Sequence, residues 1–290
     1  MIEINNVSKS FGSFKALDNI SINVKKGEIH GIIGENGAGK TTLIKCLVGI
    51  YKPDEGEILI DGSPVFENPT VKEKIGYVAD SNAYFSDYSV KRMIKFFKEV
   101  YKDFDEEFFY RLNEVFNLDI KRMVGRLSKG QQMRLAFMLN IACSPKVLVL
   151  DEPTSGLDVI AKRQLMDILI EQVEKKEITV IISSHHLSEL EKLCDSLTII
   201  NNGKIQYESD LDTLREQVKK LQVVFDREPD RALLEKSFKV ERIGSVYYLT
   251  TDNYTLNTQQ QLKDMGATIV EQVGMSLEEI FIFTTGKGVI

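Results

Sequence analysis

A glycine-rich stretch near the N-terminus has the residue types and the spacing that phosphate binding requires. Residues Gly34–Thr42, GENGAGKTT, match the pattern G-x-x-x-x-G-K-[ST] between a predicted strand (28–33) and a predicted helix (40–50). Glycines allow backbone N–H groups to surround the β-phosphate of a nucleotide, Lys40 can reach the β and γ oxygens, and the Thr41 hydroxyl can ligate Mg²⁺. We therefore predict a nucleotide site formed by Gly34, Asn36, Gly37, Ala38, Gly39, Lys40, Thr41 and Thr42.

Two acidic residues follow a second apolar run further along the chain. The segment VLVLDEP (147–153) begins with four apolar residues that predict a central strand, and Asp151 and Glu152 come at its end. Beside a phosphate loop, Asp151 can complete a Mg²⁺ shell, and Glu152 can orient or deprotonate a water molecule for attack on the γ-phosphate. The alternative, two capping or solvated acids, does not account for their joint position after a buried strand.

The composition narrows the class of protein. The chain has 290 residues and a net charge of −6, so it lacks the basic footprint of a protein that binds DNA or RNA. Its three cysteines form no C-x-x-C pair and no Cys/His cluster, which favours buried thiols over disulfides or a zinc site. No run of about 18 apolar residues is present, so we expect any action at a membrane to depend on a partner.

Alternating strands and helices are needed to bring the two motifs together. Two N-terminal segments (2–7 and 20–24) have the pattern of antiparallel strands. Beyond them, the apolar pattern predicts an α/β fold with a mainly parallel sheet and helices on both faces. The predicted strands are 56–60, 75–78, 146–150, 179–183 and 196–200, and the predicted helices are 131–143, 160–175 and 187–194.

Residues 84–116 differ in composition from the rest of the chain. They contain 11 aromatic side chains, separated by lysines and acids at helical spacing. We interpret residues from about 82 to 126 as a helical subdomain, in which most of the rings pack a local core. A minority of them can form an exposed groove for a partner, because large apolar patches on a protein surface mark binding sites.

A new group of predicted strands and helices begins after about residue 211. Predicted strands cover 222–225, 240–243, 246–250 and 268–273, and predicted helices cover 230–237, 256–265 and 276–283. We therefore expect two domains, at 1–212 and 213–290. The second is predicted to be a small α/β appendage that is accessory or regulatory. It could support dimer formation, or it could be a cap that only stabilises the protein.

Three further motifs follow along the chain, and a protein with a phosphate loop does not need them to bind a nucleotide. LSKGQ spans residues 127–131, SGLD spans 155–158, and SSHH spans 183–186. Together with the phosphate loop and VLVLDEP, they resemble the motif set of the ATP-binding subunits of ABC transporters, over about residues 1–210. The resemblance implies a P-loop NTPase fold of the ABC ATPase type, with ATP and Mg²⁺ bound.

The resemblance assigns roles to residues outside the phosphate loop. In the family, two ATPase domains pack head to tail, and the signature of one covers the γ-phosphate that the other holds. By the same resemblance, His185 is the switch histidine that joins Glu152 and Lys40 in catalysis, whereas His186 occupies a variable position. Phe11 lies where the family places an aromatic ring on adenine. The residues expected to act on nucleotide bound by a facing subunit are Ser128, Gly130, Gln131 and Asp158.

Two residues depart from the family pattern. Lys129 replaces the second glycine of the signature, and it either adds positive charge near the nucleotide or lies in solvent. Asp80, in IGYVAD, replaces the usual glutamine, and it either ligates Mg²⁺ beside Thr41 and Asp151 or points at solvent. The lysine-containing signature and the aromatic-rich segment together resemble export-type ATPases of Gram-positive bacteria that are encoded apart from their permease.

The resemblance implies the ATP-hydrolysing subunit of an ABC transporter, in which ATP-driven dimer closure is coupled to a separate membrane permease, with export preferred over import. The expected partners are ATP, an integral membrane permease and a second ATPase subunit, in a homodimer or a heterodimer, and no nucleic acid. The expected location is cytoplasmic, peripheral on the inner face of the cell membrane.

Three alternatives stand beside this prediction. One is a soluble non-transport ABC ATPase that acts on a ribosome or nucleic acid, which the acidic net charge disfavours. Another is a subunit that binds nucleotide but is the inactive half of a heterodimer. Only the departures at Asp80 and Lys129 support this alternative. The third is a simple P-loop kinase, which does not explain LSKGQ or SSHH.

Overall fold

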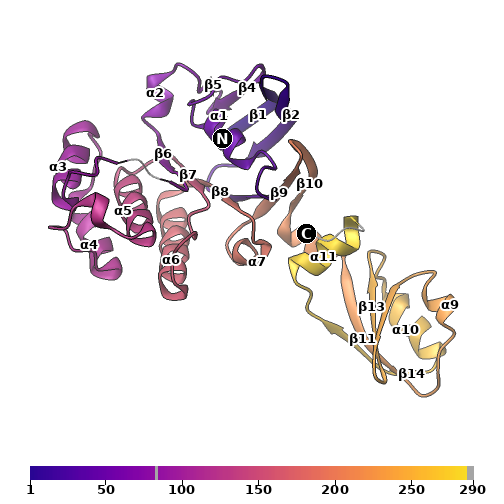
Figure 1. The fold of residues 1–290 in the computed structure, drawn as a ribbon. Coiled ribbons are helices and arrows are strands. Elements are labelled where there is room, and N and C mark those ends of the chain that lie inside the picture. Colours follow the sequence, from indigo (N-terminus) through magenta and orange to yellow (C-terminus); the bar gives the residue numbers. More distant parts are fainter. Residues whose placement is uncertain (82–83, 286–290) are drawn as a thin grey trace. The chain divides into compact units, whose positions relative to one another are not determined.

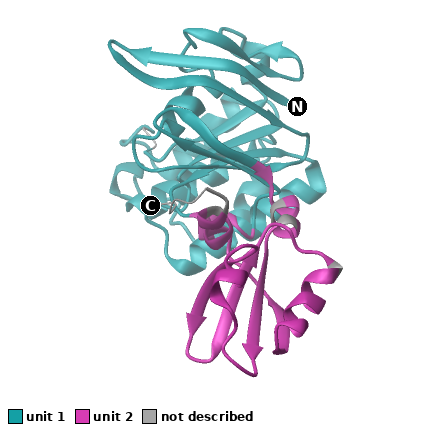
Figure 2. Ribbon diagram, turned by 90° about the vertical axis from the view of Figure 1, so that its right-hand side faces the viewer, with its two compact units in different colours: residues 1–186, 193–208 teal, residues 187–192, 209–290 magenta. Residues whose placement is uncertain are grey.

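Residues 1–81 and 84–285 are described by the computed structural model, and the chain forms two compact units (Figure 2). The first unit contains residues 1–186 and 193–208, and the second contains residues 187–192 together with the chain from 209 onward. The sequence placed one boundary after residue 212, whereas the structure places it after 208. Residues 187–192 join the second unit because Glu191 accepts hydrogen bonds from Arg215 and from the Leu277 backbone.

The N-terminal sheet of the first unit is antiparallel, with the strand order β2-β1-β4-β5 (Figure 1). Its strands are β1 (Ile2–Phe11), β2 (Phe14–Val24), β4 (Glu55–Ile60) and β5 (Ser63–Pro64). Both β1 and β2 are longer than the sequence pattern predicted. Register shifts and the positive φ of Asn6 and Asn19 interrupt the alternation of apolar and polar residues along these strands. The full length of the strands therefore could not be recognised from the sequence.

A second sheet of six strands has the order β10-β9-β3-β8-β7-β6. The strands are β3 (Ile29–Ile33), β6 (Ile75–Val78), β7 (Val147–Asp151), β8 (Thr179–Ser184), β9 (Ser196–Asn201) and β10 (Lys204–Asp210). The pairs β3–β8, β3–β9, β6–β7 and β7–β8 are parallel, which confirms the predicted mainly parallel sheet. Ligands bind at the carboxyl edge of such sheets, where the phosphate loop follows β3 and Asp151 ends β7.

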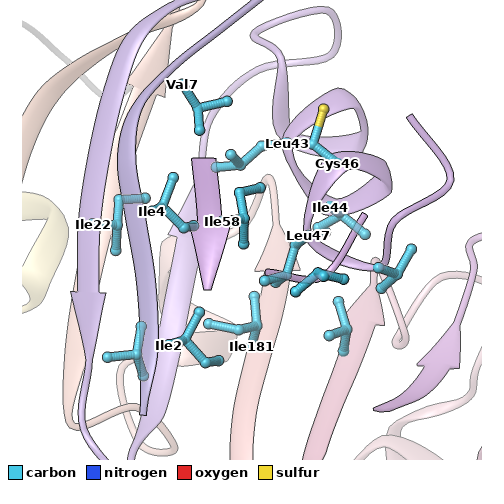
Figure 3. Packing of buried hydrophobic residues seen from close by; sticks show 14 of the residues in the cluster. Ile2, Ile4, Val7, Ile22, Leu43, Ile44, Cys46, Leu47, Ile58 and Ile181 are labelled. Atoms are coloured by element: carbon cyan, nitrogen blue, oxygen red, sulfur yellow. The ribbon is translucent and has the colours of Figure 1, made fainter. Parts of the chain in front are cut away.

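The helix α1 (Lys40–Leu47) packs between the two sheets (Figure 3). Its apolar side chains Leu43 and Ile44 are fully buried in a cluster that includes Ile4 of β1 and Ile181 of β8. Burial of each such side chain contributes about 1.5–3 kcal/mol to stability. The helix that follows the phosphate loop is thereby fixed to both sheets.

The predicted helical subdomain contains α3 (Val90–Val100) and α4 (Glu106–Phe116), and both helices contact α5 (Lys129–Ala142), which lies beyond its predicted end. Phe109 is completely buried, and Phe116 packs edge to face on Phe137 of α5, with ring centroids 6.1 Å apart. The buried rings therefore form a local core. The aromatic-rich segment is folded around α5, the helix whose N-terminus carries the signature.

The remaining elements of the first unit are short, apart from one long helix. They are α2 (Pro69–Lys72), the 3₁₀ turn η1 (Val124–Arg126) and α6 (Val159–Lys176). No helix among the described residues is long and apolar enough to cross a membrane.

The second unit contains a four-stranded antiparallel sheet with the order β12-β13-β11-β14. Along the chain its elements run β11-α9-β12-β13-α10-β14, which is the topology of a ferredoxin-like domain. The bounds are β11 (Lys219–Phe225), α9 (Arg231–Leu234), β12 (Lys239–Ile243), β13 (Val246–Thr251), α10 (Leu256–Asp264) and β14 (Ala267–Val273). The core of this sheet contains Leu221, Val223, Leu234, Tyr247, Leu249 and Leu262.

Three more helices belong to the second unit. They are α7 (Leu187–Leu190), α8 (Leu211–Gln217) and α11 (Leu277–Thr285), and α7 contacts α11. The sequence predicted a helix over 187–194, which is wrong in its second half, because the chain turns after Leu190. It did not predict α8. Lys220 of β11 forms an ion pair with Glu279 of α11, which holds this last helix to the sheet.

Candidate functional site

The glycine-rich loop encloses a cavity of about 270 Å³ at the start of α1. Gly39 has φ of 112°, and a Cβ there would lie 2.7 Å from the carbonyl oxygen of Ala16, so only glycine fits. The N-terminus of α1 directs free N–H groups into this region, as an anion site requires. The cavity is lined by Phe14, Ala16, Glu35, Asn36, Gly37, Gly39, Lys40, Thr41, Thr42, Asp80 and Glu152.

Lys40 is almost completely buried at the base of the loop, with 5% of its surface exposed. Its Nζ donates to the carbonyl oxygens of Gly34 at 2.5 Å and Glu35 at 3.2 Å, and lies 3.2 Å from Glu152 Oε1. A buried ammonium is costly unless it has such partners. The loop thus holds a positive charge at the position where the phosphates of a nucleotide would lie.

Asp151 is buried at the end of β7, with 1% of its surface exposed. Burial raises the pKa of this carboxyl, and hydrogen bonds from Ser183 and Thr41 partly offset the effect. Ser183 Oγ donates to Asp151 Oδ1 at 2.7 Å. The strand β8 therefore orients the carboxylate, and the Thr41 hydroxyl of the phosphate loop lies against it.

Glu152 follows Asp151 with a positive φ of 51°, which is uncommon for a residue other than glycine. Its backbone N–H donates to Ser183 Oγ at 3.0 Å, and its Oε2 lies 2.8 Å from His185 Nδ1. Glu152 Oε1 is buried and has no hydrogen-bond partner among the described residues, although Lys40 lies within ion-pair distance. One carboxylate oxygen is held by the histidine, and the other is available to a further donor.

The oxygen atoms near the phosphate cavity suit Mg²⁺. Thr41 and Asp151 supply a hydroxyl and a carboxylate in mutual contact, and Asp80 lines the same cavity. Among the described residues, no group of three or more acidic, histidine or cysteine side chains is arranged to hold a metal ion alone. Mg²⁺ is usually bound by one or two protein ligands together with waters and substrate phosphates.

The signature residues cap the helix α5. Ser128 Oγ accepts from the Gln131 backbone N–H at 3.2 Å, and Gln131 Oε1 accepts from the Ser128 N–H at 3.0 Å, which is a capping box. A Cβ at Gly130 would lie 2.4 Å from the carbonyl oxygen of Gly156, so the glycine permits close packing of the two loops. Ser128 is exposed, whereas Gln131 is half-buried.

Asp158 has two structural partners. Its side chain accepts from the Ala161 backbone N–H at 2.9 Å and thereby caps α6, and this hydrogen bond together with Arg134 lowers its pKa. The guanidinium of Arg134, on α5, lies 2.7 Å from the same carboxylate. The predicted contact of Asp158 with nucleotide in a facing subunit stays a prediction.

Two aromatic rings lie near each other at the hairpin of β1 and β2, where Phe11 pairs with Phe14 in register. Phe14 lines the phosphate cavity, whereas Phe11 does not and instead packs edge to face on Tyr51, with centroids 5.4 Å apart. Phe11 remains 45% exposed. The predicted stacking of Phe11 on adenine therefore stays a prediction.

The structure brings most of the predicted loop residues and Asp80, Asp151, Glu152 and His185 to one edge of the sheet. The signature residues and Asp158 do not line this cavity. The sequence reasoning missed Phe14, Ala16 and Glu35 of the lining, and it missed Ser183, which joins Asp151 to the Glu152 backbone. Ser183 begins the motif SSHH, so its position was available from the sequence.

Known proteins share this arrangement of motifs. The family model "ABC transporter" matches residues 17–155. The bacitracin transport ATP-binding protein BcrA of Bacillus licheniformis is 30% identical over 302 residues, which cover 100% of this chain and 99% of that protein. The ABC transporter ATP-binding protein YtrB of Bacillus subtilis (strain 168) is 28% identical over 287 residues, covering 99% and 98%.

A solved structure supports the same relation. An ATP-binding subunit of an ABC transporter superposes with a TM-score of 0.68 and 27% identity, and the match covers 75% of this chain and 92% of that one. The phosphate loop, the acidic pair after β7 and the histidine after β8 thus occur in a fold and a sequence that are related as a whole. The chain belongs to the ATP-binding subunits of ABC transporters and is an ATPase of that family.

Proposed function

We propose that this ATPase drives a separately encoded integral membrane permease, and that the transporter exports its substrate. The observation that carries the proposal is the position of Glu152, which lies between Lys40 and His185 at the phosphate cavity. A relative named for bacitracin transport, similar over the whole chain, supports the transport role. On that basis we propose that the chain acts at the inner face of the cell membrane, bound to its permease.

The geometry supports a hydrolytic mechanism. Lys40 and the backbone N–H groups of Gly37 and Gly39 bind the phosphates of ATP. Glu152 orients a water molecule in line with the γ-phosphate and accepts its proton as the water oxygen attacks phosphorus and ADP leaves. His185, which Glu152 holds at 2.8 Å, stabilises the γ-phosphate charge.

The proposed metal site uses Thr41 and Asp151, with Asp80 at the edge of the cavity. When bound there, Mg²⁺ would neutralise negative charge on the β and γ oxygens. The contact between the Thr41 hydroxyl and the Asp151 carboxylate supports this assignment.

We further propose that two ATPase subunits share their sites. Ser128 is exposed at the N-terminus of α5 and lies outside the subunit's own phosphate cavity, as expected for a residue that acts on nucleotide in a facing subunit. Val159 and Ile160, directly after Asp158, are 82% and 71% exposed. Two adjacent apolar side chains in solvent indicate a surface that a partner covers.

The helical subdomain supplies the proposed docking surface for the permease. Phe85 is 50% exposed, stacks on Tyr88 with centroids 4.8 Å apart, and contacts Phe96 edge to face at 5.5 Å. These rings follow Asp80 closely in the chain. A partly exposed apolar cluster connected to Asp80 by a short segment of chain can transmit closure of the ATPase to a membrane partner.

Reconstitution tests the proposed transport role. The tagged chain is purified from detergent-solubilised membranes of its own host, and each bound integral membrane protein is placed in liposomes with the purified ATPase. We expect one such protein to stimulate ATP hydrolysis by wild type and to bind Phe85→Glu more weakly, with Val115→Glu on α4 as the control. The proposal fails if no integral protein stimulates the ATPase and ribosomes or DNA do so instead.

A further inference from the structure

The two departures from the family pattern, Asp80 and Lys129, contact each other. Lys129 Nζ lies 2.9 Å from Asp80 Oδ1 and 3.0 Å from Ser155 Oγ. The stem of the lysine passes over Gly156, 3.5 Å from the position that a Cβ would take there. One ammonium therefore joins the loop after β6, the N-terminus of α5 and the loop after Glu152.

Asp80 also belongs to the phosphate cavity, which it lines together with Lys40, Thr41 and Glu152. After burial and the charge of Glu152, the charge of Asp80 contributes to the raised pKa of Asp151. Three carboxylates thus meet at the place where phosphates bind. Lys40 neutralises Glu152, and Lys129 neutralises Asp80.

We propose that Lys129 is a positioning residue for the subunit's own nucleotide site. Its ammonium holds the Asp80 carboxylate at the mouth of the cavity and neutralises it while the site lacks metal and nucleotide. Once the cavity is occupied, Asp80 turns to the bound cation, and Lys129 is released beside Ser128 at the exposed start of α5. A subunit that has loaded its own site then presents an additional positive charge to a facing subunit.

The exposure of the pair suits an exchange of partners. The side chains of Lys129 and Asp80 are 54% and 48% exposed, so the ion pair is weak enough to open without a large cost. A divalent cation with oxygen ligands competes well for a carboxylate in such a position. The family pattern has a glutamine in place of Asp80 and a glycine in place of Lys129. A protein with that pattern has neither the negative charge at the first position nor the positive charge that neutralises it.

The inference rests on the proposed nucleotide site, and ATP binding measured by calorimetry tests it. ATP is titrated into wild type, Lys129→Gly and Lys129→Gln, first with a chelator and then with Mg²⁺. Without metal, we expect both variants to bind ATP about 5-fold more weakly, because an unneutralised Asp80 repels the phosphates. With Mg²⁺, the difference should fall below about 2-fold, since the ion replaces the lysine as the partner of Asp80.

Two controls make the experiment decisive. Lys91→Gly removes another exposed lysine from the first turn of a helix, α3, and should leave both affinities unchanged. In an Asp80→Asn background, Lys129→Gly should lose its effect on metal-free binding, as a double-mutant cycle requires for a coupled pair. Equal losses in Lys91→Gly and Lys129→Gly, or a loss that persists with Asp80→Asn, would overturn the inference. A wild-type protein that binds no ATP would instead refute the nucleotide site itself.

Discussion

At the scale of single residues, Glu152 is the proposed general base of the site. The strained φ of this residue persists because Ser183 accepts from its backbone N–H, and its carboxylate lies between Lys40 and His185. Its buried Oε1 has no hydrogen-bond partner within the part of the chain that the structure describes, although Lys40 Nζ lies 3.2 Å away, so this oxygen can accept a proton from water. The residue therefore combines a fixed position with an open acceptor.

Replacement of Glu152 by glutamine keeps the shape of the side chain and removes its charge. We expect ATP turnover to fall roughly 10²–10⁴-fold, because an amide is no base, while ATP still binds to Lys40 and the loop glycines. Phosphate release and ATP titration measure the two effects. Glu174→Gln, an exposed glutamate on α6, is the matched control. Wild-type turnover in Glu152→Gln would show that another group accepts the proton.

Local motifs were predictable from the sequence, whereas contacts between distant loops were not. The phosphate loop is a continuous segment, so its glycines, Lys40 and Thr41 could be placed from spacing alone. The Asp80–Lys129 ion pair joins residues 49 positions apart, and it depends on the paths of two loops that no local pattern specifies. The same holds for Phe14, which lines the cavity where the sequence pointed to Phe11 as the relevant ring.

At the scale of elements, a buried polar cluster joins the edge of β3 to β9. His30 is 1% exposed, its Nδ1 lies 2.6 Å from Ser196 Oγ, and its Nε2 lies 2.9 Å from Thr198 Oγ1. Burial alone would raise the pKa of Glu28, but the neighbouring His30 and hydrogen bonds from Ser196 and the Lys25 backbone lower it to about 2. The cluster fixes these strands below the phosphate loop.

The lowered pKa of Glu28 makes a pH-dependent contribution to stability. Its pKa of about 2 in the folded protein lies below the ordinary glutamate value of 4.5, so the contribution is present above pH 4.5 and is lost as the pH falls toward 2. We expect Glu28→Gln to lower the unfolding free energy by about 1–3 kcal/mol at pH 7 and by less at pH 4. Urea unfolding at both pH values measures this, with the exposed Glu57→Gln as control. An equal loss at both pH values would exclude the charged hydrogen bonds as its cause.

The position of α1 between two sheets gives a second prediction at this scale. Ile44 is completely buried, whereas Ile50, shortly after the same helix, is 53% exposed. Ile44→Ala should destabilise the first unit by about 2–5 kcal/mol through lost burial and a residual cavity. Ile50→Ala should change stability by less than about 0.5 kcal/mol. Thermal or urea unfolding compares the two, and similar losses would contradict the packing described for α1.

Elements with strong apolar periods could be predicted, and polar or irregular ones could not. The strands β3, β7 and β8 are short runs of buried residues, which the sequence displays directly. The strand β10, by contrast, has no fully buried side chain, and only Ile205 and Tyr207 alternate with its polar residues, so its apolar pattern is weak. Helix α7 ends early because Glu191, the residue after it, accepts hydrogen bonds from Arg215 and from the Leu277 backbone. The sequence does not show these tertiary contacts.

At the scale of the whole molecule, the account requires a second ATPase subunit. Ser128 lies outside its own cavity, and Val159 and Ile160 are exposed at the start of α6. Ser128 caps α5 within its own chain, but it does not line the phosphate cavity of that chain. A shared site explains both, since the signature would reach a facing phosphate and the apolar pair would be covered.

A charge in that apolar pair should prevent assembly without harming the nucleotide site. We expect Ile160→Glu, in the Glu152→Gln background, to bind ATP as its parent does but to remain monomeric. Val115→Glu, an equally drastic change at an exposed valine of α4, should leave assembly intact. Sedimentation with ATP and Mg²⁺ distinguishes these outcomes. A dimer that tolerates Ile160→Glu would place the interface elsewhere.

The shared site is tested most directly by the mass of Glu152→Gln in solution, measured by light scattering on a sizing column. We expect the variant to bind ATP and to hydrolyse it far more slowly than wild type, so a closed pair should accumulate. The account predicts a monomer of about the chain mass, 32.9 kDa, without nucleotide and a dimer with ATP and Mg²⁺. A monomer in both conditions, although ATP is bound, would contradict the claim that two subunits complete each other's sites.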